Sequence, residues 1–293
     1  MKIYDCTTFY SEHMMLDIRF NILNEFVNKF IVVESMYSHS GEKKKLNFDI
    51  NNYPKFKNKI IYLVIDHEPE DLIKVDLNFK QHHKRMNSLK RIEQSYDYME
   101  RGIHEASDED LIILSANDEI PNLNSKQFKD NKKNILIFKQ LFFYYKFNLL
   151  YDRMSWFGSK ACKKKYLKSF SWLRNQKNKS YPFWRLDTYF SKLKNTNLQI
   201  IQDGGWHFTN IKSPEELFKK MKNFGHHDEF ELSGLTVEDM KNKINNRKVF
   251  YNHLADKENS DKWNFEYELK KFDDKLLPTY IFKNRDKFKE WFD

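Results

Sequence analysis

The stretch Asp110-Leu-Ile-Ile-Leu-Ser-Ala-Asn-Asp-Glu-Ile-Pro121 decides the fold, because a short apolar run in it ends at polar side chains and a proline. The run from Leu111 to Leu114 does not alternate, which is the pattern of a strand buried on both faces of a parallel sheet. Ligands of such sheets bind beyond the carboxyl ends of the strands, so Asp118 and Glu119 stand where chemistry is expected. A solvated turn is the competing interpretation.

Further apolar runs alternate with segments of helical periodicity. The runs expected to form strands are Met1–Cys6, Phe30–Val33, Ile60–Ile65, Ile135–Phe138, Phe142–Phe147 and Leu198–Ile201. Apolar residues recur at helical spacing after Ser11, from Asn78 to Glu105, and from Ser213 to Phe224. Strands that alternate with helices predict an α/β fold with a mixed central sheet flanked by helices, followed by a helical C-terminal extension.

Composition excludes several classes of protein. The net charge is +9, but the basic residues are dispersed and form no recognisable nucleic-acid module, so no nucleic-acid partner is expected. Two cysteines exclude a disulfide framework and a four-cysteine zinc site. The sequence has no apolar signal region near its start and no stretch of about 18 apolar residues, so neither a signal peptide nor a membrane anchor is expected. The expected location is the cytoplasm.

Polar residues at strand ends and at a helix start are candidate ligand contacts. Asp5 is expected at the end of the first predicted strand and Glu34 directly after the second, which places both at one edge of the sheet. Basic residues at the start of a helix oppose its dipole unless an anion lies nearby, which makes Arg85 and the neighbouring Asn87 candidates. A helix face in water explains the same residues.

The sequence contains neither a glycine-rich dinucleotide fingerprint nor a Gly-Lys-Ser/Thr phosphate loop. A nucleotide would instead be held by side chains and by Mg²⁺ or Mn²⁺ bridging its diphosphate to one or two carboxylates. Trp206 and His207 follow two glycines and suit a cleft, as a platform for a sugar ring and a metal or phosphate ligand, although a structural histidine fits equally. His227 and Glu229 resemble zinc ligands, but a third ligand at local spacing is missing.

Several short motifs occur in the order seen in glycosyltransferase family 17, which the chain resembles over essentially its whole length. These motifs are Lys2–Tyr10, Phe30–Ser35 with Ser40-Gly41, Asp118–Pro121, Gly205–Phe208, His227–Phe230 and Leu277–Phe288. The family includes the transferase that adds bisecting N-acetylglucosamine to the β-mannose of N-glycans. The resemblance implies a GT-A type fold, a UDP-sugar donor, N-acetylglucosamine as the transferred sugar, inversion at the anomeric carbon, and an oligosaccharide or glycoconjugate acceptor.

The resemblance also implies one glycosyltransferase domain over residues 1–293. Residues 1–121 would bind the nucleotide sugar, residues 122–230 the acceptor, and residues 231–293 would form the helical extension. Animal members carry a Golgi anchor, and this chain is expected to be a bacterial or viral relative that acts in the cytosol. The sequence leaves the oligomeric state open.

One departure from the family concerns the metal. The motif of the family is Asp-x-Asp-Glu-Ile-Pro, and Ala116 stands in place of the first aspartate. The expected metal site is therefore weakened, with Asp118 binding Mn²⁺ or Mg²⁺ directly, the diphosphate supplying much of the rest, and His207 as a further ligand. A catalytically inactive protein that binds sugar nucleotides or glycans, with a degenerate metal site, is the alternative.

For a transferase of this kind, roles are expected for three sets of residues. The expected donor-binding residues are Asp5, Thr7, Glu34, Arg85, Asn87, Asp118 and Glu119. The expected acceptor-binding residues are Trp156, Trp206 and His227. The general base, which deprotonates the acceptor hydroxyl, is Glu229 or Asp203, with Asp187 as a third possibility.

Overall fold

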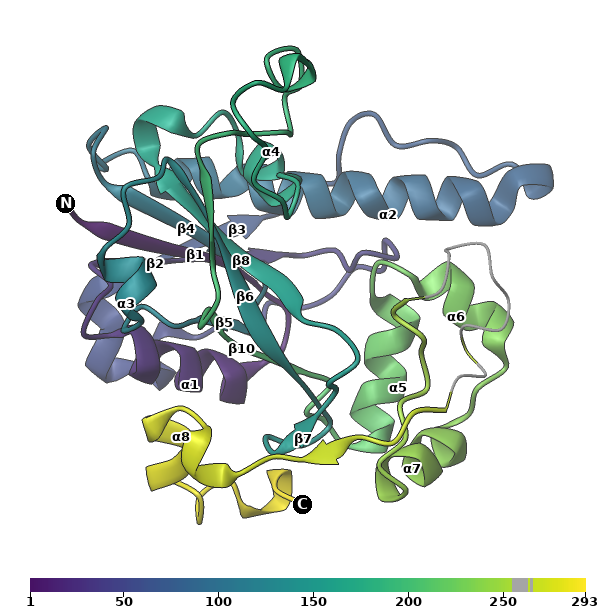
Figure 1. Cartoon of the computed structure of the whole chain (residues 1–293). Coiled ribbons are helices and arrows are strands. Elements are labelled where there is room, and N and C mark those ends of the chain that lie inside the picture. The colour runs from purple at the N-terminus through teal and green to yellow at the C-terminus, as the bar shows by residue number, and fades with distance from the viewer. Residues whose placement is uncertain (255–262, 264–265) are drawn as a thin grey trace.

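The computed structural model describes residues 1–254, 263 and 266–293, and it confirms an α/β fold with a mixed central sheet between helices (Figure 1). The first 115 residues build the parallel half of the sheet. Strand β1 (Ile3–Phe9) pairs in parallel with β2 (Lys29–Ser35) and β4 (Leu111–Ser115), and β2 pairs in parallel with β3 (Ile60–Ile65). In the strand order β3-β2-β1-β4, the chain adds β2 and β3 on one side of β1 and β4 on its other side. Parallel sheets form a ligand crevice at such a point.

The second half of the sheet mixes parallel and antiparallel pairs. Strand β8 (Trp156–Lys163) is antiparallel to β4 and to β6 (Ile135–Tyr144), and β9 (Leu198–Ile201) and β10 (Gly205–Thr209) run parallel to β6. The short strand β5 (Glu119–Pro121) is antiparallel to β10. At the far edge, β7 (Leu149–Leu150) joins β6 to β11 (Lys270–Lys271).

Eight α-helices of the described residues surround this sheet. They are α1 (His13–Leu23), α2 (Lys80–Asp97), α3 (Lys126–Lys129), α4 (Phe170–Arg174), α5 (Pro214–Asn223), α6 (His227–Ser233), α7 (Val237–Asn245) and α8 (Thr279–Lys283). Figure 1 shows α2 and α4 on one face of the sheet and α1 on the other, with α5, α6 and α7 grouped beside it. No helix of residues 1–254, 263 and 266–293 is both long and apolar enough to cross a membrane.

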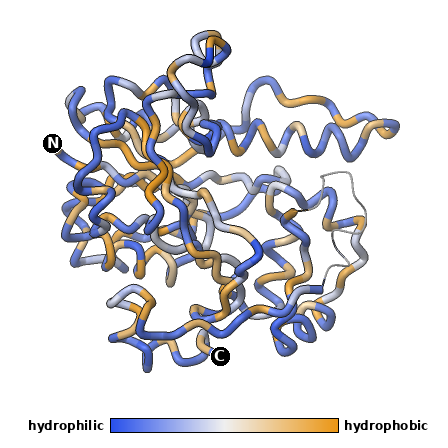
Figure 2. Tube along the Cα trace, viewed as in Figure 1, coloured by the Kyte–Doolittle hydropathy of each residue, from blue (hydrophilic) through white to orange (hydrophobic). Residues whose placement is uncertain are grey.

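Alternating side chains of the parallel strands fill two cores, one on each face of the sheet. Phe30 and Val32 pack with α1 residues such as Phe20, whereas Ile31 and Val33 pack on the α2 side with Tyr96. A strand that is buried on both faces shows no alternation in its sequence, and Figure 2 shows the resulting continuous apolar path through the centre of the molecule. A third core joins the end of β6 to α5, α6 and α7.

Three predicted strands differ from the structure. The first strand continues through Phe9, so Asp5 lies in its middle, and the prediction that Asp5 ends a strand is wrong. The runs at 135–138 and 142–147 belong largely to one strand, β6, whose pairing with β8 shifts between Ile137 and Lys139. The polar residues between the two runs lie within the strand, because a local irregularity of this kind bends a strand without ending it.

Candidate active site

A pocket opens at the carboxyl ends of β1, β2 and β4, the position expected for a ligand of an α/β sheet. Residues from the loops after these strands and from α2 and α5 line it, so segments far apart in the sequence meet here. The lining residues are Thr8, Phe9, Tyr10, Glu12, Val33, Ser35, Tyr37, His39, Lys44, Ser95, Tyr96, Ala116, Asn117, Asp118, Lys220, Asn223 and Phe224. A neighbouring pocket shares Glu12, Asp118 and Lys220, which extends the cleft beyond this end.

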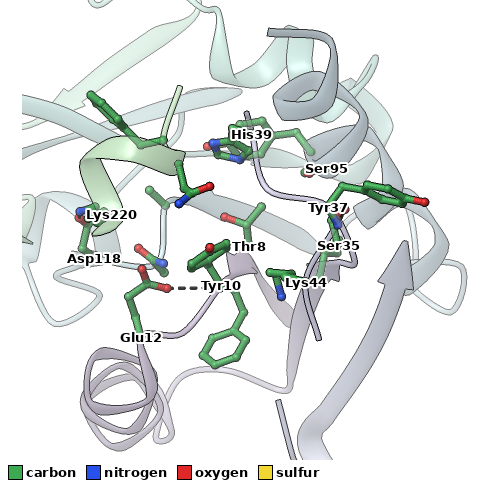
Figure 3. A pocket seen from close by; sticks show the side chains of 17 residues that line it. Thr8, Tyr10, Glu12, Ser35, Tyr37, His39, Lys44, Ser95, Asp118 and Lys220 are labelled. Carbon is green, nitrogen blue, oxygen red and sulfur yellow. Dashed lines mark hydrogen bonds and ion pairs between the residues drawn. The ribbon is translucent and has the colours of Figure 1, made fainter. Parts of the chain in front are cut away.

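The two ends of the pocket differ in chemistry. Figure 3 shows Glu12, Asp118 and Lys220 together at one end and Ser35, Tyr37 and Lys44 at the other, with Tyr10 between them. The first end carries two carboxylates and an ammonium group, whereas the second offers hydroxyl groups and a phenol ring beside Lys44, whose ammonium group is paired with Glu34. The pocket is therefore suited to an elongated ligand with a charged part and an aromatic part.

The loop between β4 and β5 is held in place by groups outside the pocket. The carboxylate of Glu119 is buried and accepts hydrogen bonds from the Ala116 amide (2.7 Å) and from the indole Nε1 of Trp156 (2.8 Å). The guanidinium group of Arg19 donates to the carbonyl groups of Ala116 and Glu119. Glu119 therefore fixes the loop that presents Asp118, and its expected contact with the donor is not retained.

Asp118 stays ionised because two basic side chains face its carboxylate. His207 Nε2 lies 3.4 Å from Oδ1, and Lys220 Nζ lies 3.9 Å from Oδ2. Burial alone raises the pKa of this carboxyl, but its electrostatic and hydrogen-bond interactions with His207 and the charge of Lys220 outweigh burial and hold the pKa well below its usual range. The carboxylate is thus available as an anionic ligand over the whole physiological pH range.

His207 is fixed between two aromatic rings. Its imidazole stacks on Trp156 at 4.4 Å and on Phe142 at 4.7 Å between ring centroids. Its Nδ1 atom is buried and has no hydrogen-bond partner among the described residues. The neutral tautomer with the proton on Nε2 leaves only an acceptor unpaired and points the N–H group toward Asp118.

The residues around Asp118 fit a divalent cation only if a bound diphosphate supplies further oxygen ligands. No three His, Cys, Asp or Glu side chains of residues 1–254, 263 and 266–293 gather closely enough to hold a metal. A cation bound to His207 Nε2 would force the proton onto Nδ1, and a buried unpaired donor costs about 1–3 kcal/mol. The donor set therefore suits Mg²⁺ or Mn²⁺ held by Asp118 and diphosphate oxygens, and His207 is better placed to donate to Asp118 than to bind the metal.

Lys220 reaches the pocket from a helix whose start is strongly specified. Ser213 caps α5 with a reciprocal capping box to Glu216, and Pro214 occupies the first turn. Lys220 Nζ also donates to Asn210 Oδ1 at 3.0 Å. Burial lowers the pKa of Lys220, while the charge of Asp118 raises it in part.

Besides Glu119 and Arg85, four other residues expected at the donor do not line this pocket, because their side chains serve the fold. Asp5 is buried and forms a bidentate ion pair with Arg19. The Thr7 hydroxyl donates to the Thr8 carbonyl. Glu34 pairs with Lys44 and accepts from the amides of residues 47 and 48 and from a tyrosine hydroxyl. Asn87 forms two hydrogen bonds with the backbone of residue 73.

A second group of expected residues gathers below α6, outside the pocket. Arg85 donates to the Gly225 carbonyl and lies 3.2 Å from His226 Nε2, and His226 Nδ1 lies 3.3 Å from Glu229 Oε1. His227 is buried, with Nδ1 at 3.0 Å from the Phe224 carbonyl oxygen. These contacts hold the junction of α5, α6 and α2, so neither an acceptor contact by His227 nor a base role for Glu229 follows from the geometry.

The remaining expected residues are dispersed. Trp206 points to the α1 side of β10, opposite to His207, because successive side chains of a strand alternate. Asp203 is exposed and accepts a hydrogen bond from Asn122, and Asp187 pairs with Arg185 and Lys194 on a distant loop. Trp156 lies behind His207. The prediction that Trp206 and His207 share a cleft is wrong.

Sequence reasoning missed Glu12, His39, Lys44 and Lys220. Glu12 directly precedes α1, yet it lines the cleft, and its Oε1 lies 3.7 Å from Lys212 Nζ. Burial lowers the pKa of His39 to about 4, so this histidine lines the pocket as a neutral group. The Ser38–Lys43 loop and the helix after Ser213 were visible in the sequence, but only the tertiary fold brings them to Asp118.

A comparison with models of known families identifies the family of this chain. A model of the family described as Glycosyltransferase family 17 matches residues 1–163, which include β1 to β4 and the Asp118 loop. No curated protein matches the chain. Among solved structures, the chain is similar to the inositol-1-phosphate CTP transferase from T. maritima, with 11% identity and a TM-score of 0.34 over 76% of this chain and 96% of that chain.

Proposed function

Because this chain belongs to glycosyltransferase family 17, we propose that it transfers a sugar from a UDP-sugar to a hydroxyl group of a glycan acceptor, with inversion at the anomeric carbon. N-acetylglucosamine is the proposed sugar, as the family resemblance implies. The observation that carries the proposal is the family match across β1 to β4, together with the pocket that these strands form around Asp118.

The chemistry of the pocket supports one orientation of the donor. The nucleoside would lie at the end lined by Ser35 and Tyr37, where hydroxyl groups and a ring face a polar aromatic base. The diphosphate would lie at the other end, where Lys220 supplies a positive charge beside Asp118. Lys220 would neutralise part of the negative charge of the diphosphate that a tightly bound metal ion would otherwise neutralise.

A divalent cation would be held by Asp118 and by the diphosphate, and its chemical contribution would be to stabilise negative charge on the departing UDP. His207 would keep Asp118 oriented by donating from Nε2. Lys220 would face the same phosphate oxygens. These two contacts come from the chain itself and act whether the cation is bound tightly or weakly.

We propose Glu12 as the general base in place of Glu229, Asp203 and Asp187. Its carboxylate lies in the cleft at the same end as Asp118, and within the pocket's described lining these two are the only carboxylates. The acceptor oxygen would form a bond to the anomeric carbon as the bond to the diphosphate oxygen breaks. The hydroxyl proton would pass to Glu12, and UDP would leave as the anion.

The test replaces Asp118 by Asn and measures UDP-sugar turnover and UDP binding. Asp118→Asn keeps the shape but removes the charge, so turnover should fall by at least about 100-fold. Asp203→Asn is the control, because it makes the same chemical change at an exposed carboxylate that does not line the pocket. Equal activity of the two variants, with UDP binding unchanged, would refute the assignment of Asp118.

The alternative is a protein that binds sugar nucleotides or glycans without catalysing transfer, and the observation that favours it is Ala116 in the pocket. The same assay separates the two. Release of UDP by the wild-type chain, with an acceptor or by slow hydrolysis, supports the enzyme. Tight UDP binding without any release across acceptors and metals supports the binding protein.

A further inference from the structure

A loop between α4 and β9 exposes a concentrated apolar cluster. Phe183 (72% exposed), Trp184 (68%), Leu186 (74%), Tyr189 (70%) and Phe190 (91%) lie within eight consecutive residues. Single exposed apolar side chains are ordinary on soluble proteins, but a contiguous group of large ones indicates an interaction surface. In Figure 1 this segment rises above α4 at the top of the view, away from the grouped helices α5 to α7.

The base of this loop is fixed, so the cluster is a built feature. The Lys177 amide donates to the Leu193 carbonyl at 3.1 Å, which brings the two ends together as in an Ω-loop. Gln176 is buried below them, and its amide group donates to the Trp172 carbonyl while its Oε1 accepts from Asn195. These hydrogen bonds close the base of the loop, and the exposed apolar side chains lie between its two ends.

The loop also carries a net positive charge. Between residues 175 and 195 there are five basic residues and one acid, Asp187. Arg185 and Lys194 pair with that acid through bonds of 2.7–2.8 Å. Lys177, Lys179 and Lys192 are exposed and pair with no carboxylate of the described residues.

We propose that this loop, residues 177–193, docks on an anionic lipid surface. Large aromatic side chains partition into the interface between headgroups and acyl chains, and flanking lysines attract anionic headgroups with about 1 kcal/mol each. A second copy of the chain is the less suitable occupant, because two loops that each carry a net positive charge repel one another. The proposal does not depend on the sugar chemistry of the pocket.

The experiment measures binding of the full chain to vesicles of phosphatidylcholine alone and of phosphatidylcholine mixed with anionic phosphatidylglycerol. The wild-type chain should sediment with the mixed vesicles at low salt, and raised salt should release it. The variant Phe183→Ser/Trp184→Ser/Phe190→Ser and the variant Lys177→Gln/Lys179→Gln/Lys192→Gln should each weaken this binding by at least about tenfold.

The control is Leu232→Ser/Leu276→Ser, which removes two apolar side chains that are 73% and 62% exposed elsewhere on the molecule. It should bind the mixed vesicles as the wild type does. All substituted side chains are exposed, so thermal unfolding should confirm that each variant is folded.

Three results would overturn the proposal. The first is that the wild type does not bind anionic vesicles. The second is that the control variant and the loop variants lose vesicle binding to the same extent. The third is a dimer of the wild type in sedimentation experiments that the aromatic variant abolishes while vesicle binding is absent, which would make the loop a contact between copies. A failure of UDP binding in the separate pocket assay would leave this result unaffected.

Discussion

The carboxylate of Asp118 combines properties that are rarely found together: it is nearly buried, ionised, and opposed by both an imidazole and an ammonium group. Burial would favour its neutral form, and the two basic neighbours reverse that preference. An additional cation at this carboxylate must therefore compete with Lys220. Weak metal binding in the absence of a diphosphate follows from this arrangement.

Restoring the missing carboxylate tests the balance at this site. Ala116 lines the pocket, so Ala116→Asp should place a second carboxylate beside Asp118 and raise the affinity for Mn²⁺ by at least about tenfold, or about 1.4 kcal/mol. Without metal the two carboxylates repel, so the variant should melt earlier and regain stability when Mn²⁺ is added. Calorimetric titration with Mn²⁺ in the presence of UDP measures the change.

Ala116→Asn is the matched control, since it adds similar volume without charge. If both variants bind Mn²⁺ with the affinity of the wild type, position 116 does not contribute to a cation site and the weakened-metal interpretation fails.

For single residues, the sequence indicated the sheet edge at which Asp118 lies but not the side chains that surround it, and this has one physical reason. A strand places successive side chains on opposite faces, and a pattern that is apolar on both faces does not reveal which face meets the ligand. Asp5 and Glu34 therefore had the right residue type near the right edge but point into ion pairs within the protein. Glu12 lies in the cleft although its sequence context shows only a helix start.

Among the elements, β8 is tied to the end of α4 by a buried lysine. Lys160 donates to the carbonyl groups of Arg174 (2.6 Å) and Gln176 (2.7 Å), and burial, together with the charge of Arg174, lowers its pKa to about 8. A neutral amine keeps two N–H groups, which is enough for both carbonyls. The contact therefore survives deprotonation, and only the cost of burying the charge disappears.

The deprotonation of Lys160 should be visible in the pH dependence of the free energy of unfolding. Between about pH 8 and 10.5 the unfolded chain keeps the proton that the folded chain has lost, so the free energy of unfolding rises with pH by up to about 1.4 kcal/mol per unit. Lys160→Met removes the titration, and its stability should lack this rise. Urea unfolding of both proteins across this range measures the difference in slope.

Burial also raises the pKa of several tyrosines, and these groups destabilise the fold above their usual pKa of 10. The wild type and Lys160→Met share these tyrosines, so their effect cancels when the two pH profiles are compared. Parallel pH profiles of the wild type and Lys160→Met would show that Lys160 keeps its ordinary pKa in the fold, contrary to the expectation.

Regular elements were the most predictable part of this chain. The bounds of β3 and β9 agree with the predicted runs, and the capping signal at Ser213 marked the start of α5. The two parts of β6 were predicted as separate strands because local periodicity cannot distinguish an irregular strand from two strands joined by a turn. Long-range pairing decides between them, and it leaves no local signal.

In the whole molecule, the family match and the active site cover different parts of the chain. The match ends at residue 163, whereas His207 and Lys220, which face Asp118, come from β10 and α5. Their contribution depends on the parallel pairing of β10 with β6 and on the packing of α5 against its neighbours. The sequence indicated the α/β class and the sheet edge, but it could not show which distant side chains would close the site.

The stacking of His207 on Trp156 gives the protein an optical reporter of its own site. The emission of an indole ring depends on its immediate surroundings, and a ligand that draws Asp118 away from His207 changes the surroundings of the Trp156 ring. Titration with UDP should therefore change the tryptophan fluorescence of the wild type, and Trp156→Phe should abolish the change while the other tryptophans remain. An unchanged signal in both proteins would mean that ligand binding does not reach this ring pair.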